Sequence, residues 1–143
     1  MAATHRFSGS RLDLHTSLAP EQVAGISKRV GDGTKGNIRI GVNHVRFEGA
    51  SPGRTVFSIR ALGDAWELMV FHVAITADGA DSSVRTGVDS FKTAQRKMYG
   101  IIPTGPKSLS GYKTYKLFMH NLADAITAQD SSARSQITEV ATI

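Results

Sequence analysis

The chain has 143 residues, of which 41% are hydrophobic and 20% charged, with a formal net charge of +5 and no cysteine. A chain of this length is expected to form a single domain, residues 1–143, around one hydrophobic core. The lack of cysteine excludes a disulfide framework, a thiolate nucleophile and a cysteine-ligated zinc site.

The apolar segments are too short or too charged to cross a membrane. The longest, residues 66–75, contains Glu67 and His72, whereas a span needs about 20 consecutive apolar residues. The N-terminal stretch MAATHRFSGSRLDLH also lacks the apolar core of a secretory signal. We therefore expect a cytoplasmic protein.

The first elements in chain order are a strand and a short helix. Residues 11–16, RLDLHT, place Leu12 and Leu14 on one face and polar side chains on the other, which is typical of a half-buried strand. Pro20 suits a first helical turn, and apolar residues recur after it at spacings of three and four. This pattern predicts a helix over residues 20–30.

Three extended segments follow, each bounded by turn residues. In residues 36–50 the apolar face changes phase, which indicates a bulge or a strong bend. Residues 54–62 alternate, and residues 66–77 are apolar on both faces. A strand of the latter kind is expected at the centre of a sheet. We expect the last helix to cover one of its faces and the short helix or a second subunit to cover the other.

A hairpin and a further strand complete the sheet. Asp78 and Gly79 form a reversal signal between extended segments. Residues 84–102 then predict one long or broken strand with an irregularity at Gly87.

The C-terminal part predicts a helix and a tail. The helix is expected over residues 111–128, with Ser108 or Ser110 as its N-cap and an apolar stripe that includes Phe118. Residues 129–143 are polar, and we expect this tail to fray.

The predicted order is strand, helix, four or more antiparallel strands and a long C-terminal helix, which is an α+β fold in two layers. Two stretches, LDLHTSLAPEQVAGI and GPKSLSGYKTYKLFMHNLADAI, together with the hairpin strands between them, resemble the START-like, helix-grip (SRPBCC) superfamily, which includes polyketide cyclases and lipid-binding proteins. The resemblance covers roughly residues 7–128 and rests on the order of elements. Because full members of the superfamily usually have more strands than the segments found here, the resemblance implies either further strands within residues 36–50 and 84–102 or a reduced relative of the fold. It implies an antiparallel sheet that grips the last helix, as in START- or TBP-like architectures, with an apolar cavity between sheet and helix.

From this resemblance we expect a non-catalytic protein that binds a small apolar or aromatic ligand between the sheet and the C-terminal helix. No cofactor and no catalytic residue is predicted. Tyr112 and Tyr115 stand out, since a buried hydroxyl needs a partner and can orient a ligand. The candidate pocket residues are His44, Phe57, Met69, Phe71, His72, Phe91, Tyr112, Tyr115 and Met119.

Three other functions remain open. The same large side chains are typical of a filled core, which would leave a structural or partner-binding domain. A pocket histidine or tyrosine would suit a polyketide-cyclase-like enzyme. The positive charge permits weak binding to polyanions, but the basic residues are scattered and no RNA-binding motif is present, so nucleic acid is not the expected partner. A homodimer through the face that carries Trp66 is a further expectation.

The five histidines do not predict a metal site. They lack the i, i+4 spacing of a helical metal site and no acidic cluster joins them. Asp13 and His15 share a strand face with Arg11 and superficially resemble a catalytic base with its orienting carboxylate. An exposed polar strand face accounts for these residues without further assumption and is the favoured interpretation.

Overall fold

The computed structural model describes residues 9–38, 41–61, 63–94, 97–98, 102–103 and 108–139. The main elements in chain order are β1 (Arg11–Thr16), α1 (Pro20–Gly33), β2 (Lys35–Ile38), β3 (Gly41–Ser51), β4 (Arg54–Ala61), β5 (Trp66–Asp78), β6 (Asp81–Phe91), α2 (Tyr112–Gln129) and β11 (Arg134–Thr138). Between β6 and α2 lie four two-residue strands, β7 (Thr93–Ala94), β8 (Lys97–Met98), β9 (Ile102–Pro103) and β10 (Ser108–Leu109). Strand β7 pairs with β10, and β8 pairs with β9.

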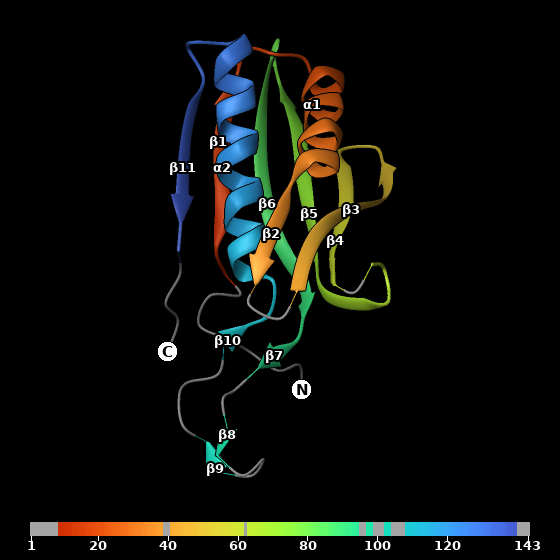
Figure 1. Cartoon of the computed structure of the whole chain (residues 1–143). Coiled ribbons are helices and arrows are strands. Elements are labelled where there is room, and N and C mark those ends of the chain that lie inside the picture. The colour runs from red at the N-terminus through yellow and green to blue at the C-terminus, as the bar shows by residue number, and fades with distance from the viewer. Residues whose placement is uncertain are drawn as a thin grey trace.

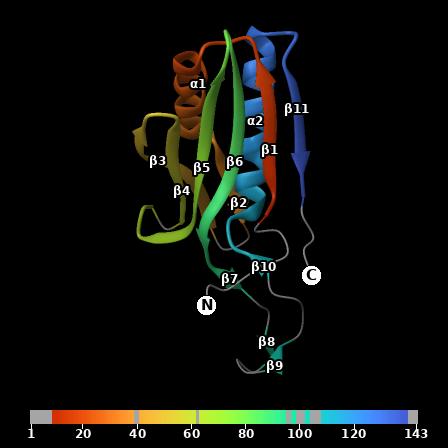
Figure 2. The same ribbon diagram turned by 180° about the vertical axis from the view of Figure 1, so that it is seen from behind.

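The long strands form one antiparallel sheet in the order β11-β1-β6-β5-β4-β3-β2. Both helices lie on the same face of this sheet (Figure 1). The view from behind shows the opposite face, which neither helix covers (Figure 2). The predicted α+β class, with an antiparallel sheet and a long helix near the C-terminus, is confirmed. Neither α1 nor α2 combines the length and the hydropathy that crossing a membrane would require.

The hydrophobic core lies between the sheet and the two helices. Phe118 of α2 packs against Phe57 of β4 and Phe71 of β5, with ring centroids 5.2 and 4.9 Å away. Helix α2 also contacts strands near both edges of the sheet, β11 and β1 on one side and β3 and β2 on the other. The sheet therefore curves around α2.

The predicted segment at residues 36–50 is two strands. Strand β2 pairs with β3 in antiparallel register, from Lys35 opposite His44 to Ile38 opposite Gly41. The expected irregularity within the segment is present as a register shift between Phe47 and Gly49. This hairpin explains the phase change of the apolar face, because the chain reverses direction within the segment.

The chain reversal predicted at Asp78 and Gly79 is confirmed. The irregularity expected at Gly87 lies slightly beyond that residue in β6. Strand β5 ends at Asp78 and β6 begins at Asp81, with Gly79 at a φ of 64° that favours glycine. The register shift between β5 and β6 falls where Phe71 pairs with Val88 and Val70 pairs with Ser90, so Asp89 is the extra residue.

One face of the central strand is covered by helices as expected, but the short helix α1 lies on that same face and does not cover the other one. Cover of the other face by a second subunit stays a prediction. Met69, Phe71 and Val73 of β5 face the helices and are buried. Val70 and Ala74 alternate with these residues and are partly buried on the uncovered face. Long side chains on neighbouring strands, such as those of the two arginines opposite Ala74, Arg54 and Arg85, can shield small apolar residues without a second layer.

Helix α1 begins as predicted and runs one turn further. Pro20 is its first residue, and the Ala19 N–H donates to the Gln22 side chain at 3.0 Å, which satisfies a backbone donor at the helix start. The helix continues through Gly31 to Gly33. A Cβ at Gly31 would stand 2.7 Å from Phe57 Cε1, so the absence of a side chain allows the helix to pack directly on the sheet.

Gly111, and not Ser108 or Ser110, occupies the N-cap of α2. Its φ of 81° lies in the left-handed region, which glycine adopts at little cost. The turn brings Gly111 against Ile59, whose Cγ2 would be 3.2 Å from an added Cβ. A close approach to the sheet therefore decides how this helix starts.

The described part of the tail is not frayed as predicted, because residues 134–138 form the edge strand β11. Residues 140–143 of that prediction lie outside the described residues. Leu12 pairs with Ile137 and Leu14 with Ser135 in antiparallel register. Asp130, which we assigned to the tail, is only 7% exposed and joins the end of α2 to the end of β1. The composition of the tail is polar because β11 is an exposed edge, where only Ile137 and Thr138 are partly buried.

Asp130 accepts four hydrogen bonds. Its Oδ2 accepts from Thr16 Oγ1 at 2.7 Å and from the Ser17 N–H at 2.8 Å. Its Oδ1 accepts from the hydroxyl and the N–H of Ser132, at 2.6 and 3.1 Å. The bonds from Ser132, Thr16 and Ser17 favour the charged form and hold the pKa of Asp130 far below its usual range.

The two glycines of α1 provide a matched test of the helix packing. We expect Gly31→Ala to lower the free energy of unfolding by roughly 1–3 kcal/mol, because the methyl group overpacks the buried Phe57 ring. Gly25→Ala should raise it by about 0.5–1 kcal/mol, because nothing lies within 4 Å of its Cβ position and alanine favours the helix. Urea unfolding measures both variants, and equal effects would contradict the close approach at Gly31.

Asp130 makes stability depend on pH. Because its pKa is lower in the folded state, its contribution is present above the unfolded pKa of about 3.9 and is lost as the pH falls below that value. We expect Asp130→Asn to be less stable than the parent at pH 7, since the amide nitrogen would face two donors, and to lose less stability between about pH 5 and pH 2.

Urea unfolding at a series of pH values measures this difference. Asp124→Asn is the control, because Asp124 is exposed on α2 and makes no hydrogen bond or ion pair within the described residues. Parallel pH curves for the parent and Asp130→Asn would contradict the assigned role.

Candidate functional site

Most of the residues predicted to line a pocket between the sheet and α2 lie in or against the hydrophobic core. Five of the predicted pocket residues meet there and are 0–1% exposed, namely Phe57, Met69, Phe71, Tyr115 and Met119. Their rings are in contact, with the Phe57 and Phe71 centroids 5.4 Å apart and those of Phe71 and Tyr115 5.0 Å apart. In the described part of the chain, this interior is a packed aromatic core.

The Tyr115 hydroxyl is fully engaged inside the core. It donates to the Ser10 carbonyl at 2.8 Å and lies 2.8 Å from Thr86 Oγ1. Thr86 Oγ1 also accepts from the Leu12 N–H at 2.9 Å, so its own proton is available for Tyr115. Burial raises the pKa of Tyr115 well above its usual value, because the phenolate would be poorly solvated. The hydroxyl thus anchors α2 to β1 and β6.

Tyr112 and Phe91 lie at the border of this core. Tyr112 donates to Glu139 Oε1 at 2.7 Å, and Ser10 Oγ lies 3.3 Å from its hydroxyl. Burial, with a further contribution from the Glu139 carboxylate, raises the pKa of Tyr112 to about 12. Phe91 is partly buried against the core. Tyr112 therefore connects the start of α2 to the residue that follows β11.

His44 and His72 lie on the uncovered face and do not join the other predicted pocket residues. His44 Nε2 is 2.8 Å from Asp64 Oδ1, and His72 Nδ1 is 2.9 Å from Asp89 Oδ1. Strand alternation could have assigned His72 to this face, since both of its neighbours in the sequence, Phe71 and Val73, are core residues.

Ion pairs between charged side chains occupy much of the uncovered face. Arg54 lies 3.0 Å from Asp89, Arg60 lies 3.2 Å from both Glu48 and Glu67, and Arg46 lies 3.7 Å from Glu48 and from Asp64. Exposed pairs of this kind contribute little to stability. These charged side chains keep the uncovered face hydrated. Their pairing leaves little net charge on the half of the face that β3, β4 and β5 form.

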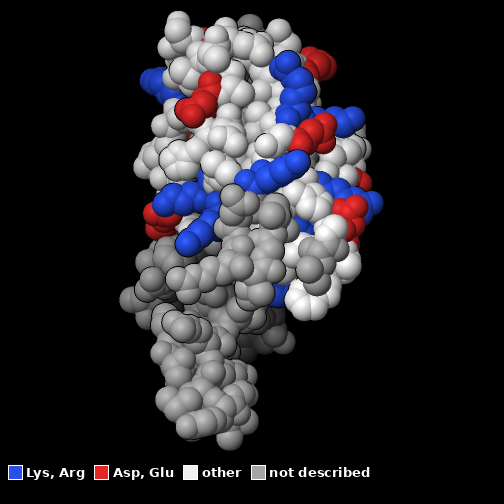
Figure 3. Space-filling model, viewed as in Figure 1, with Lys and Arg blue, Asp and Glu red and all other residues white. Residues whose placement is uncertain are grey.

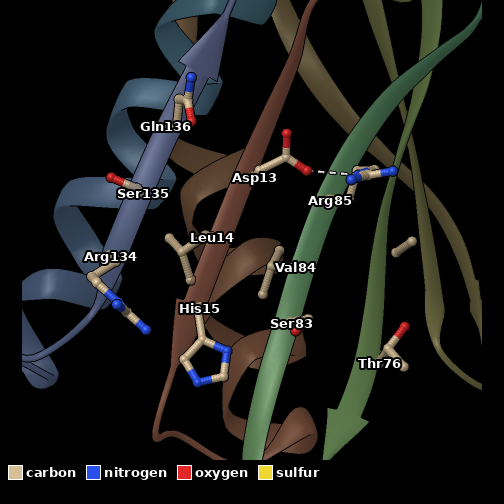
Figure 4. Close-up of a pocket in the computed structure, with 11 residues that line it drawn as sticks. Asp13, Leu14, His15, Thr76, Ser83, Val84, Arg85, Arg134, Ser135 and Gln136 are labelled. Atoms are coloured by element: carbon tan, nitrogen blue, oxygen red, sulfur yellow. Dashed lines mark hydrogen bonds and ion pairs between the residues drawn. The ribbon is translucent and has the colours of Figure 1, made fainter.

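The other half of this face contains a groove of about 690 Å³. It lies over β11, β1, β6 and β5 (Figure 4). Its polar lining residues are Asp13, His15, Thr76, Ser83, Arg85, Arg134, Ser135 and Gln136, and Leu14, Ala74 and Val84 complete it. The groove is open to solvent along the sheet.

Two arginines hold the Asp13 carboxylate in the groove. Arg85 Nε donates to Oδ1 at 2.6 Å, and Arg11 Nε donates to Oδ2 at 3.0 Å. Partial burial works to raise the pKa of Asp13, but the bonds from Arg85 and Arg11 outweigh burial and lower it. Asp13 does not orient His15, whose Nε2 instead lies 3.1 Å from Asp81 Oδ2. The base and orienting carboxylate considered from the sequence are therefore not assembled.

Sequence reasoning missed the groove because β11 supplies one of its walls. Alternation in RLDLHT did place Arg11, Asp13 and His15 on one face. The contribution of Arg134 and Gln136 depends on the pairing of β11 with β1, which the polar composition of the tail did not indicate.

The charges of the described surface balance. Of the 17 lysines and arginines, those at positions 6, 39, 96, 97 and 107 have no described side chain, whereas all 12 acidic residues do. On the helix face, acidic side chains lie among the basic ones (Figure 3). The described surface therefore gives no support to polyanion binding.

Two further predictions concern metals and a dimer. Within the described ranges, no group of three histidine, cysteine or acidic residues could hold a metal ion. Trp66 is 60% exposed at the start of β5, and a homodimer through it stays a prediction.

Comparison with protein-family models, with curated proteins and with solved structures found no match to this chain.

Gly87 and His72 offer a test of the uncovered face. A Cβ at Gly87 would stand 2.7 Å from His72 Cε1, so Gly87→Ala must displace the ring from Asp89. We expect this substitution to destabilise the parent chain but to be neutral or stabilising in a His72→Ala background, since alanine then gains about 0.4–1 kcal/mol through the unfolded state. A double-mutant cycle by urea unfolding measures the coupling, and additive effects would contradict the contact.

Proposed function

We propose that this chain is a non-catalytic binding protein whose ligand occupies the groove on the uncovered face of the sheet. The observation that carries the proposal is the contrast between the two faces. The interior that was expected to hold a ligand is filled by rings 4.9–5.4 Å apart, whereas polar side chains from four strands line an open groove of about 690 Å³. This volume is in the range of small-molecule sites.

The nature of the lining favours a polar ligand over a lipid. Leu14 and Val84 are 4% and 2% exposed, so the apolar residues of the floor offer little surface. Hydroxyl, amide, carboxylate and guanidinium groups stand around this floor. Such groups would be left without hydrogen bonds under an apolar ligand, which is costly.

We also propose that the chain shares the helix-grip architecture of the START-like superfamily. Support comes from the sheet order, in which β1 lies beside β6 and the remaining strands follow as hairpins, and from the position of α2 within the curve of the sheet. An apolar ligand between sheet and α2, as that superfamily implies, would have to displace side chains such as Phe118, which is fully buried.

A ligand screen distinguishes the two sites. We expect polar metabolites to raise the melting temperature, because a ligand that binds the folded state must stabilise it. Backbone amide shifts in ¹⁵N-labelled protein should then centre on β1, β6 and β11. Lipids and aromatic polyketides serve as the comparison set.

Either of two results would overturn the groove assignment. One is a lipid that copurifies with the chain in native mass spectrometry. The other is a set of ligand-induced shifts centred on Tyr115 and Phe118 in place of the sheet edge.

A further inference from the structure

Arg134 differs from the other arginines of the uncovered face. Among the residues that the structure describes there, Arg11, Arg46, Arg54, Arg60 and Arg85 each lie within 4.0 Å of a carboxylate. The side chain of Arg134 has no ion pair or hydrogen bond within the described chain, and it lines the groove from β11. Its guanidinium is available to a ligand.

Arg85 is also available in part. Its Nε donates a hydrogen bond to Asp13. Its two terminal nitrogens make no hydrogen bond or ion pair within the described residues, and its side chain is 67% exposed. Asp13 in turn is occupied on both oxygens by Arg85 and Arg11. Both oxygens of the carboxylate in the groove lining are therefore bonded to arginines, and Arg134 adds a further positive charge to the lining. The carboxylates of Asp81 and Asp78 lie outside the lining, 3.1 and 4.0 Å from the His15 ring.

The strand register arranges these groups in two rows. Thr76 pairs with Ser83, Ser83 with His15 and His15 with Arg134, so one row ends at Arg134. The next row runs from Ala74 through Arg85 and Asp13 to Gln136. Paired residues on neighbouring strands share a face. Figure 4 shows His15 and Arg134 on neighbouring strands beside the Asp13–Arg85 pair.

The spacing of the rows sets the size of the ligand. Arg134 and Arg85 are two strands and one row apart, which corresponds to roughly 12 Å between their Cα positions. Each guanidinium can extend several Å toward the other over His15 and Asp13. Two cations at such a separation suit a molecule with two anionic charges.

We propose that the groove binds a small organic dianion, a dicarboxylate or a phosphate ester, whose carboxylate or phosphate oxygens are held by Arg134 at one end and Arg85 at the other. Guanidinium groups form paired hydrogen bonds with both kinds of oxyanion. The hydroxyls of Ser83 and Thr76 supply further donors along the first row. This inference rests on the proposed function of the groove.

The test is an amide-shift titration of the full chain at low ionic strength with glutarate, glycerol phosphate and the neutral analogue glutaramide. We expect saturable shifts in β11, β1 and β6 with at least one dianion, and binding by glutaramide at least about tenfold weaker. Which dianion binds more tightly identifies the carboxylate or the phosphate as the preferred group.

Charge-matched variants locate the site. Arg134→Gln and Arg85→Gln should each weaken the dianion at least about tenfold, and Arg29→Gln, which removes the same charge from α1, should change the affinity less than twofold. Because Arg134 has no partner within the described chain, its variant keeps the fold intact even if Arg85→Gln releases Asp13.

The outcomes separate the two proposals. The proposal of a dianionic ligand would be wrong if Arg29→Gln weakened dianion binding as much as Arg134→Gln and Arg85→Gln do, or if glutaramide bound in the groove as tightly as glutarate. Either result would still leave the groove as a ligand site. If neither the dianions nor the polar metabolites cause amide shifts in β11, β1 and β6, both the dianion proposal and the groove proposal are wrong.

Discussion

The packing of Phe118 onto Phe57 and Phe71 is the contact on which the rest of this structure depends. It places α2 across β5, the middle strand of the sheet, and its neighbour β4. The edges then curve up to contact the same helix. Buried aromatic side chains bring large apolar areas into one place, so this contact also fills the space that a gripped helix could have left open. Stability and an internal ligand site compete for that space, and the described core favours stability.

With both helices on one face, the other face must be stable in water without a second layer. The chain meets this requirement with polar and charged side chains at many of the outward positions, and most of the charged ones are paired across strands. Where the charged side chains are paired, as around Glu48, the surface carries little net charge. At the β11 end the pairing is incomplete, because Arg134 has no partner in the described chain and Arg85 shares Asp13 with Arg11. The incomplete pairing coincides with the groove.

The sequence predicts the helices and strands of this fold better than it predicts which of them contact one another. Period-two alternation identified β1, and the spacing around Pro20 identified α1, because both signals are local. The N-cap of α2 was missed because Gly111 is chosen by its approach to Ile59, 52 positions earlier in the chain. A contact between segments so distant leaves no local pattern.

The candidate site was harder to predict for the same reason. Phe57, Phe71 and Tyr115 were correctly grouped by their apolar spacing, but spacing does not distinguish a lined cavity from a filled core. His44 and His72 were grouped with them by residue type, and alternation placed them on the other face. Strand β11 was hidden in a polar tail, since an edge strand buries few side chains and its composition matches that of a solvated segment.

The position of β11 gives the groove a rigid floor and a less constrained wall. Leu14 and Val84 in the floor belong to the core cluster, so core packing anchors the strands beneath the groove. The wall is an edge strand that, among the described strands, pairs only with β1. It is held at its start by Asp130 and just beyond its end by Glu139, whose Oε1 lies 2.8 Å from Lys116 Nζ. Binding that engages Arg134 would add to these attachments without a change in the aromatic core. Recognition can therefore vary along β11 while the fold stays the same.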